Sequence, residues 1–226
     1  MSPRRERWSD PFAGMPGRRL FVAVPLPDDG AAAIRAIVDE VRAEPLPDGA
    51  RDVRWVRLDG LHLTLRFLGP TPDDRLEGAA AAVHAIAAAA AGPIDLTLGG
   101  AGTFPPVGRP RALWVGIHEG AETLQQLAAD INGALARTGW EPDVRTFRPH
   151  LTLARSDGVA AGRQVADRLA QVMADRMIET RIERLGLFES ITGDGPARYV
   201  PVMTAPLGAM LDNGPPVYHQ DTPGPP

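Results

Sequence analysis

Hydrophobic and polar positions follow two periods along the chain, and each period predicts its own kind of element. Short apolar runs bounded by proline, glycine or polar residues predict strands at 19–26, 93–104, 110–118, 145–156, 177–190 and 197–205. Apolar residues at helical spacing predict helices over 27–44, 73–91, 119–139 and 158–176. In the first helix, Ile34, Ile37, Val38 and Val41 fall on one face, and Asp28 or Asp29 is the expected N-cap.

The segment 53–69 reads as two strands around a turn at Asp59-Gly60. A two-residue turn would place Trp55 across from Thr64, where the indole can stack on a base. A longer turn would break that register, and the alternative for Trp55 is packing in the core. Trp114, in a strand-like run, is expected in the core.

The order of the predicted elements suggests two similar halves in the chain. Each half reads as an antiparallel sheet covered by helices on one face, with a pseudo-twofold axis between the halves. We therefore expect an α+β fold with two lobes, duplicated antiparallel sheets, helices on the outer faces and a central cleft. This single bilobal domain would span residues 18–206, between flexible tails at 1–17 and 207–226 that lack hydrophobic periodicity.

The word His-Leu-Thr-Leu occurs twice, at 62–65 and 150–153, at corresponding places in the two halves. Alternate side chains of a strand share a face, so the leucines of each word can be buried while its histidine and threonine lie on the opposite face. The pseudo-twofold axis would bring both polar faces to one cleft. One His-x-Thr in a strand is more often packing than catalysis, but two matched copies indicate a site.

Two facing imidazoles suit acid–base chemistry, because histidine titrates near neutral pH. We expect His62 and His150 to be catalytic and the hydroxyls of Thr64 and Thr152 to bind a phosphate. An arginine would complete the site. Arg66 shares the parity of His62, whereas strict alternation turns Arg155 away unless the strand ends or twists there.

The remaining histidines have other expected places. His84 lies in a predicted helix, His118 at a strand end and His219 in the C-terminal tail, so none is expected to act in the site. A metal centre is disfavoured, because neither His-Leu-Thr-Leu word has a carboxylate beside it. No cofactor is expected.

Composition excludes several mechanisms. The 226 residues include no cysteine, and all 24 basic residues are arginine, which removes thiol nucleophiles, a P-loop lysine and a lysyl-nucleotide intermediate. The net charge of −4 does not favour sequence-independent duplex binding. No apolar stretch is long enough to span a membrane and no apolar region follows the basic N-terminus, so we expect no membrane contact and a cytoplasmic location.

The duplicated word and its surroundings resemble the 2H phosphoesterase superfamily, which is defined by paired His-x-Thr-x motifs. The nearer resemblance is to its bacterial and archaeal RNA 2′,3′-cyclic phosphodiesterases, the LigT or 2′-5′ RNA ligase family. It covers about residues 18–205 and rests on these landmarks in order: RLFVAVPLP, VRWV, HLTLRFLG, GTFPP, RALWVGI, FRPHLTLAR, and FES followed by Tyr199.

This resemblance implies hydrolysis of RNA 2′,3′-cyclic phosphate ends to 2′-phosphates without metal, by a protein we expect to be monomeric. It implies that His62 protonates the departing 3′ oxygen and His150 activates water. Thr64 and Thr152 would hold the phosphate, with Arg155 as a helper, and 2′-5′ ligation without ATP would be the reverse reaction. Two alternatives stay open: a hydrolase of small cyclic-phosphate nucleotides, and a non-catalytic nucleotide-binding module of the same fold.

Overall fold

The computed structural model of the chain describes residues 16–44, 53–156, 160–191 and 196–208. Helices and strands within these ranges run from Arg18 to Pro206. Most of both expected tails, 1–15 and 209–226, lies outside the described residues, so their flexibility and the domain limits 18–206 stay predictions. None of the described helices has the length and apolar character needed to cross a membrane.

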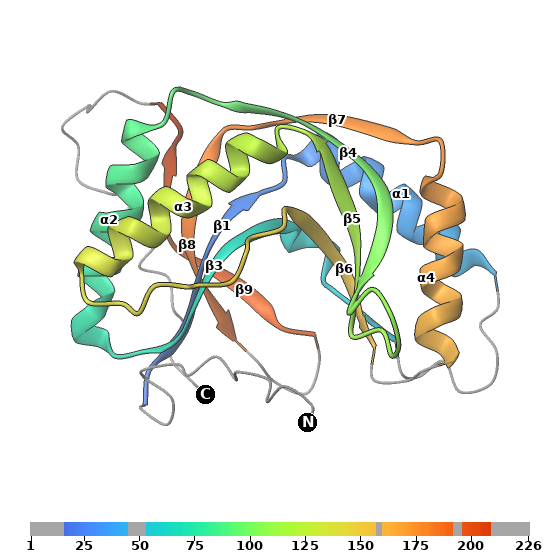
Figure 1. The fold of residues 1–226 in the computed structure, drawn as a ribbon, viewed down its shortest axis with the longest axis horizontal. Helices are drawn as coiled ribbons and strands as arrows, with labels where there is room; N and C mark the ends of the chain where they lie inside the picture. Colours follow the sequence, from blue (N-terminus) through green and yellow to red (C-terminus); the bar gives the residue numbers. More distant parts are fainter. Residues whose placement is uncertain (1–15, 45–52, 157–159, 192–195, 209–226) are drawn as a thin grey trace.

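The described strands form two antiparallel sheets (Figure 1). The first sheet has four strands in the order β3-β1-β8-β9: β3 (His62–Thr71), β1 (Arg18–Pro25), β8 (Arg184–Ile191) and β9 (Arg198–Pro206). The second has five in the order β2-β6-β5-β4-β7: β2 (Val53–Trp55), β6 (His150–Ser156), β5 (Ala112–Glu119), β4 (Ile94–Phe104) and β7 (Met177–Ile182). Each sheet therefore contains one His-Leu-Thr-Leu word, and the predicted α+β class with duplicated sheets is confirmed.

Four α-helices in the described ranges cover the two sheets: α1 (Asp28–Ala43), α2 (Leu76–Ala89), α3 (Ala121–Arg137) and α4 (Ala160–Met173). The first sheet packs against α2 and α3, and the second packs against α4, while α1 contacts α4 and β7 (Figure 1). Helix α1 thus follows a strand of the first sheet but belongs to the second lobe. Helix α3 follows a strand of the second sheet but belongs to the first lobe. The lobes are not consecutive halves of the chain, as the sequence order had suggested.

Helix α1 shows how the local sequence builds these elements. Its apolar stripe is buried as predicted, with Ile34 and Val38 fully inaccessible. The predicted cap is wrong, because Pro27 occupies the N-cap position and no side chain caps the helix. Asp28 and Asp29 instead lie in the first turn, where their negative charge complements the helix dipole.

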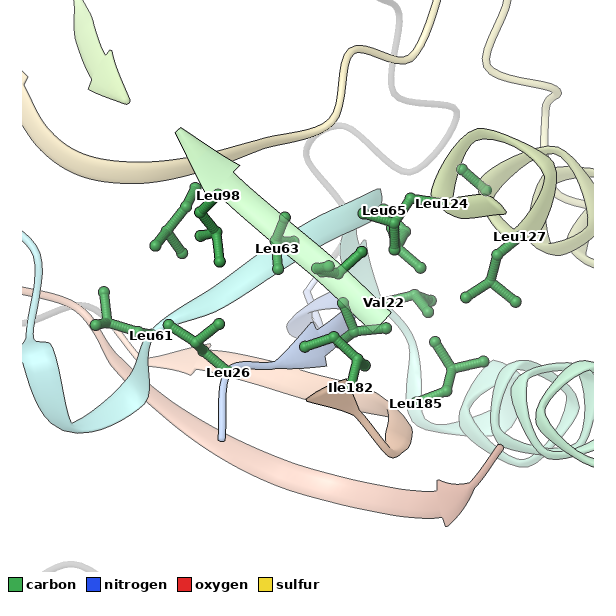
Figure 2. Close-up of a cluster of buried hydrophobic side chains, with 14 of the residues drawn as sticks. Val22, Leu26, Leu61, Leu63, Leu65, Leu98, Leu124, Leu127, Ile182 and Leu185 are labelled. Carbon is green, nitrogen blue, oxygen red and sulfur yellow. The ribbon is translucent and has the colours of Figure 1, made fainter. Parts of the chain in front are cut away.

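One contiguous hydrophobic core joins both lobes. Figure 2 shows labelled members from strands of both sheets, from the connections beside β1 and β3, and from α3, namely Val22, Leu26, Leu61, Leu63, Leu65, Leu98, Leu124, Leu127, Ile182 and Leu185. Leu63 and Leu65 are the two leucines of the first repeated word, and Leu151 and Leu153 of the second word are also in this core. The repeated leucines therefore anchor each word in the protein interior, as their alternation predicted.

The predicted hairpin over 53–69 is wrong. A 3-10 turn at Leu58–Gly60 separates β2 from β3, and the two strands lie in different sheets. Trp55 pairs with buried Ala154 of β6 and packs against the core, so it does not lie across from Thr64. The run 177–190 likewise divides between the sheets, with β7 in the second and β8 in the first.

Candidate active site

The first histidine and threonine lie on the face of β3 that points away from the core. His62 is opposite Pro25 and Thr64 is opposite Ala23 on β1, and both side chains are half-buried. Leu63, between them, is completely buried. The alternation predicted for the first word is therefore present in the structure.

A β-bulge then shifts the parity of β3. Arg66 pairs with Val22 and Thr64 pairs with Ala23, which leaves Leu65 as an extra residue on β3. Because Val22 belongs to the core, Arg66 points into the interior together with Leu65, and its side chain is only 4% exposed. The prediction that Arg66 shares a face with His62 is wrong.

The second word carries a bulge at the same place. On β6, Thr152 pairs with Trp114 and Ala154 pairs with Leu113, so Leu153 is the extra residue. Ala154 and Ser156 are buried, and Arg155 between them is exposed. Because of the bulge, Arg155 lies on the same face as His150 and Thr152. Strict alternation would have placed it on the opposite face.

Both histidines are held by the same backbone contact. Nδ1 of His62 lies 2.7 Å from the carbonyl oxygen of Gly60, and Nδ1 of His150 lies 2.6 Å from that of Arg148. A carbonyl oxygen only accepts, so Nδ1 carries the proton in each ring. Each neutral imidazole then has Nε2 as a proton acceptor, and each protonated ring has Nε2 as a donor.

Aromatic rings surround His62. Tyr199 of β9 stands edge-on to the imidazole at a centroid distance of 4.7 Å, and Phe21 of β1 lies 4.9 Å away. Phe188 of β8 stacks at 6.4 Å. These residues come from three strands of the same sheet as β3. Their segments were among the landmarks of the family resemblance, but none of the three was predicted to be a site residue.

His150 has its own aromatic neighbours. Phe104 of β4 meets the imidazole edge-on at 4.9 Å, and Trp114 of β5 lies 6.3 Å away. The predicted core position of Trp114 is wrong, because this half-buried indole shares the face of Thr152, its partner across the strands. Aromatic packing around both rings restricts their rotation and removes water from them.

Burial lowers the pKa of both histidines, because loss of hydration destabilises the charged imidazolium more than the neutral imidazole. The hydrogen bonds to Gly60 and Arg148 oppose this by raising the pKa of each ring. The two rings differ in one respect: the positive charge of Arg155 further lowers the pKa of His150.

The strands that carry the two repeated words adjoin. Strands β3 and β6 contact each other although they belong to different sheets. Burial raises the pKa of Tyr199, and the charge of Arg155 lowers it, so Arg155 acts on a ring that touches His62 as well as on His150. The charge of Arg155 thus reaches both His150 and the tyrosine ring beside His62.

Arg66 serves another part of the fold. Its Nη2 donates a hydrogen bond to the carbonyl oxygen of Glu141, and its Nη1 lies 3.5 Å from the carboxylate of Asp143. Asn132 exchanges two hydrogen bonds with the Asp143 backbone. Arg66 therefore fixes the segment between α3 and β6, which leads into His150.

The other three histidines are not part of either repeated word. His118 is exposed at the end of β5 and His84 lies within α2, while His219 is outside the described residues. In the described part of the chain, no three His, Asp or Glu side chains gather in a way that could hold a metal ion. A surface groove beside α4 contains Arg163 and Arg168, which donate to the carbonyl oxygens of Gly108, Val41 and Glu44.

The two-lobed α+β fold is that of the 2H phosphoesterases. The chain belongs to the 2′-5′ RNA ligase superfamily, whose family model matches residues 26–194. The resemblance seen in the sequence is therefore confirmed over most of the chain.

Several relatives carry the name RNA 2′,3′-cyclic phosphodiesterase. The protein of Archaeoglobus fulgidus is 30% identical over 179 residues, which are 79% of this chain and 94% of that protein. The Escherichia coli protein is 36% identical over 139 residues, or 61% of this chain and 72% of the relative. The Geobacillus stearothermophilus protein is 36% identical over 135 residues, but this match spans only 41% of its length.

Solved structures share the fold. The Thermus thermophilus protein TT0787 superposes with a TM-score of 0.64 at 27% identity, covering 84% of this chain and 98% of that one. Escherichia coli LigT complexed with 3′-AMP gives a TM-score of 0.62 at 26% identity, with the same coverage.

Proposed function

We propose that this protein hydrolyses 2′,3′-cyclic phosphate ends of RNA to 2′-phosphates. The observation that carries the proposal is that His62 and His150 are held by the same kind of hydrogen bond. Each ring is bonded through Nδ1 to the carbonyl two residues before it, and each has Nε2 left for proton transfer on the polar face of adjoining strands. The names of the relatives supply the substrate class.

In the proposed reaction, neutral His150 accepts a proton at Nε2 from water as the water oxygen attacks phosphorus. The bond from phosphorus to the 3′ oxygen breaks, and protonated His62 donates its Nε2 proton to that oxygen. The phosphate stays on the 2′ oxygen, and proton exchange with solvent restores both rings. The charge of Arg155 supports this division of roles, because it favours the neutral form of His150.

Negative charge on the non-bridging phosphate oxygens requires donors on the same face. The hydroxyls of Thr64 and Thr152 and the guanidinium of Arg155 have this placement. Donors already fixed on strands need little reorganisation as charge develops in the transition state. Thr64 and Thr152 are therefore proposed to bind the phosphate from opposite lobes, with Arg155 as a further donor on the face of Thr152.

The proposal includes several further points. The reaction needs no metal and no cofactor, and the enzyme works as a cytoplasmic monomer. Ligation is the reverse reaction, in which a 5′-hydroxyl attacks the cyclic phosphate in place of water. The absence of lysine from the whole chain agrees with a ligation that forms no lysyl-nucleotide intermediate.

The direct test is to incubate the purified protein with an oligonucleotide that ends in a 2′,3′-cyclic phosphate and to identify the product isomer. We expect a 2′-phosphate from the wild type and a loss of at least about 10²-fold in turnover for His62→Ala or His150→Ala, since acid–base groups typically contribute 10²–10⁴-fold. His84→Ala, which changes a histidine within α2 and away from both repeated words, is the matched control and should retain wild-type turnover.

Near-normal turnover by either folded site variant would contradict the proposal. Binding of the oligonucleotide without any product would instead support the non-catalytic alternative. The same assay with EDTA addresses metal use, and we expect an unchanged rate. Complete inhibition that added zinc or manganese reverses would favour a metal mechanism.

A further inference from the structure

Tyr199 reaches the first site histidine from a strand that does not adjoin β3. It lies on β9, and β1 and β8 separate β9 from β3 in the order of the sheet. Its ring nevertheless stands edge-on to His62 at a centroid distance of 4.7 Å. A Cβ atom placed on Gly60 would lie 3.5 Å from Cδ2 of the same ring. Tyr199 thus packs against both His62 and the glycine whose carbonyl oxygen holds that imidazole.

The hydroxyl of Tyr199 is open to a ligand. In the part of the chain that the structure describes, no group is hydrogen-bonded to it. The oxygen is also accessible, because it is not one of the buried side-chain atoms that lack a partner. Since the hydroxyl is bonded to the ring beside His62, it lies at most a few ångströms farther from the imidazole than the ring centre does. A phenol in this place can donate a hydrogen bond to an anionic oxygen.

The electrostatic surroundings suit such a donor. Burial raises the pKa of Tyr199, so the hydroxyl keeps its proton at any pH at which a histidine titrates. The charge of Arg155 lowers the same pKa, so the hydroxyl lies within reach of a positive charge on the other sheet. An anion bound by Arg155 next to His62 would therefore also lie beside this hydroxyl.

We infer that the hydroxyl of Tyr199 donates a hydrogen bond to a non-bridging oxygen of the cyclic phosphate. The inference rests on the proposed function and adds a catalytic residue to the same site. Of the donors already proposed, Thr152 and Arg155 lie on the second sheet, and Thr64 alone lies on the first. Tyr199 gives the first sheet a second donor beside the proposed acid, and it keeps its own proton throughout the reaction.

The first test is Tyr199→Phe, which removes the hydroxyl and keeps the ring beside His62. We expect kcat/KM on an oligonucleotide with a 2′,3′-cyclic phosphate end to fall about tenfold to hundredfold, the effect of one lost hydrogen bond to a charged group. The midpoint of urea unfolding should not change, because the ring packing is retained. Tyr218→Phe makes the same change in the only other tyrosine of the chain, and this matched control should retain wild-type kcat/KM.

Sulfur substitution gives a readout that a purely structural role would not change. The dinucleotide ApA with a 2′,3′-cyclic phosphorothioate end exists as two diastereomers, each with sulfur in place of one non-bridging oxygen. Sulfur is a weak hydrogen-bond acceptor. Tyr199→Phe should lower kcat/KM about tenfold to hundredfold on the diastereomer that keeps the contacted oxygen, and by no more than about twofold on the other, where the contact is already lost.

The outcomes separate this inference from the proposed function. A loss confined to one diastereomer would support the contact and identify the oxygen that faces the first sheet. Wild-type kcat/KM in Tyr199→Phe, or an equal loss on both diastereomers, would overturn the role of Tyr199 and leave the proposed function intact. If the wild type hydrolyses no cyclic phosphate, the proposed function fails, and the role of Tyr199 fails with it.

Discussion

At the scale of single residues, the proposed reaction requires His62 and His150 to take opposite protonation states. Their local restraints are equivalent, because each Nδ1 is bound to a backbone carbonyl and each ring lies among aromatic side chains. Only His150 has its pKa further lowered by Arg155. In the proposed reaction, the difference between acid and base therefore comes from a charged neighbour and not from the repeated word.

The lowered pKa values predict an acidic optimum for kcat/KM. Activity at low pH is limited by protonation of the base, and activity at high pH by deprotonation of the acid. Because burial lowers the pKa of both rings, the alkaline limb should lie below about 6.5, the ordinary value for histidine. The measurement is a profile from pH 4 to 9 at constant ionic strength, and an alkaline limb above pH 7 would contradict this assignment.

Arg155→Gln should change this profile on one side. Removing the cation raises the pKa of His150, so the proposed base becomes protonated at a higher pH and the acidic limb moves upward. We also expect kcat/KM at the optimum to fall about tenfold to hundredfold, because a donor to the phosphate is lost. Movement of the alkaline limb instead would contradict the assignment of the acidic limb to His150.

At the scale of elements, the bulges at Leu65 and Leu153 decide which arginine faces the histidines. The rule that side chains alternate between the two faces of a strand predicted the faces of His62, Thr64 and the leucines of the first word correctly, because β3 is regular up to the bulge. It failed for Arg66 and left Arg155 unresolved, since an extra residue is visible only in the pairing with a neighbouring strand. Register is a tertiary property that the pattern of one strand does not contain.

Matched substitutions separate the two arginines. Arg155→Met should lower turnover while changing the free energy of unfolding by less than about 0.5 kcal/mol, because the side chain is exposed. Arg66→Met should keep turnover within about threefold but cost about 1 kcal/mol of stability, through loss of the hydrogen bond to Glu141. Arg66→Ala adds a cavity and should cost roughly 2–4 kcal/mol.

Urea unfolding and turnover, measured on the same preparations, provide both values. The expected result is a crossed pattern, in which the variant that loses activity keeps its stability and the variant that loses stability keeps its activity. Loss of activity by folded Arg66→Met would show that the segment ahead of β6 must be fixed for His150 to act.

At the scale of the whole molecule, the sequence predicts the elements better than their partners. The four predicted helices and the strand of the first repeated word lie where periodicity placed them, whereas β6 begins at His150 and not at the predicted residue 145. The lobes differ from the expected consecutive halves, because β2 pairs with β6, β8 pairs with β1, and α1 and α3 each cover the other lobe. Hydrophobic periodicity reveals that a face is buried, but it does not reveal which surface buries it.

This exchange predicts that neither half of the chain folds alone. A fragment of residues 16–119 has β1 and β3 without β8, β9 or α3, and it has β2, β4 and β5 without β6, β7 or α4. Each sheet would therefore expose apolar surface that the other half normally covers. The fragment should show no cooperative unfolding transition by circular dichroism, whereas residues 16–208 should unfold in one step; a cooperative transition in the fragment would mean that the exchanged elements are dispensable.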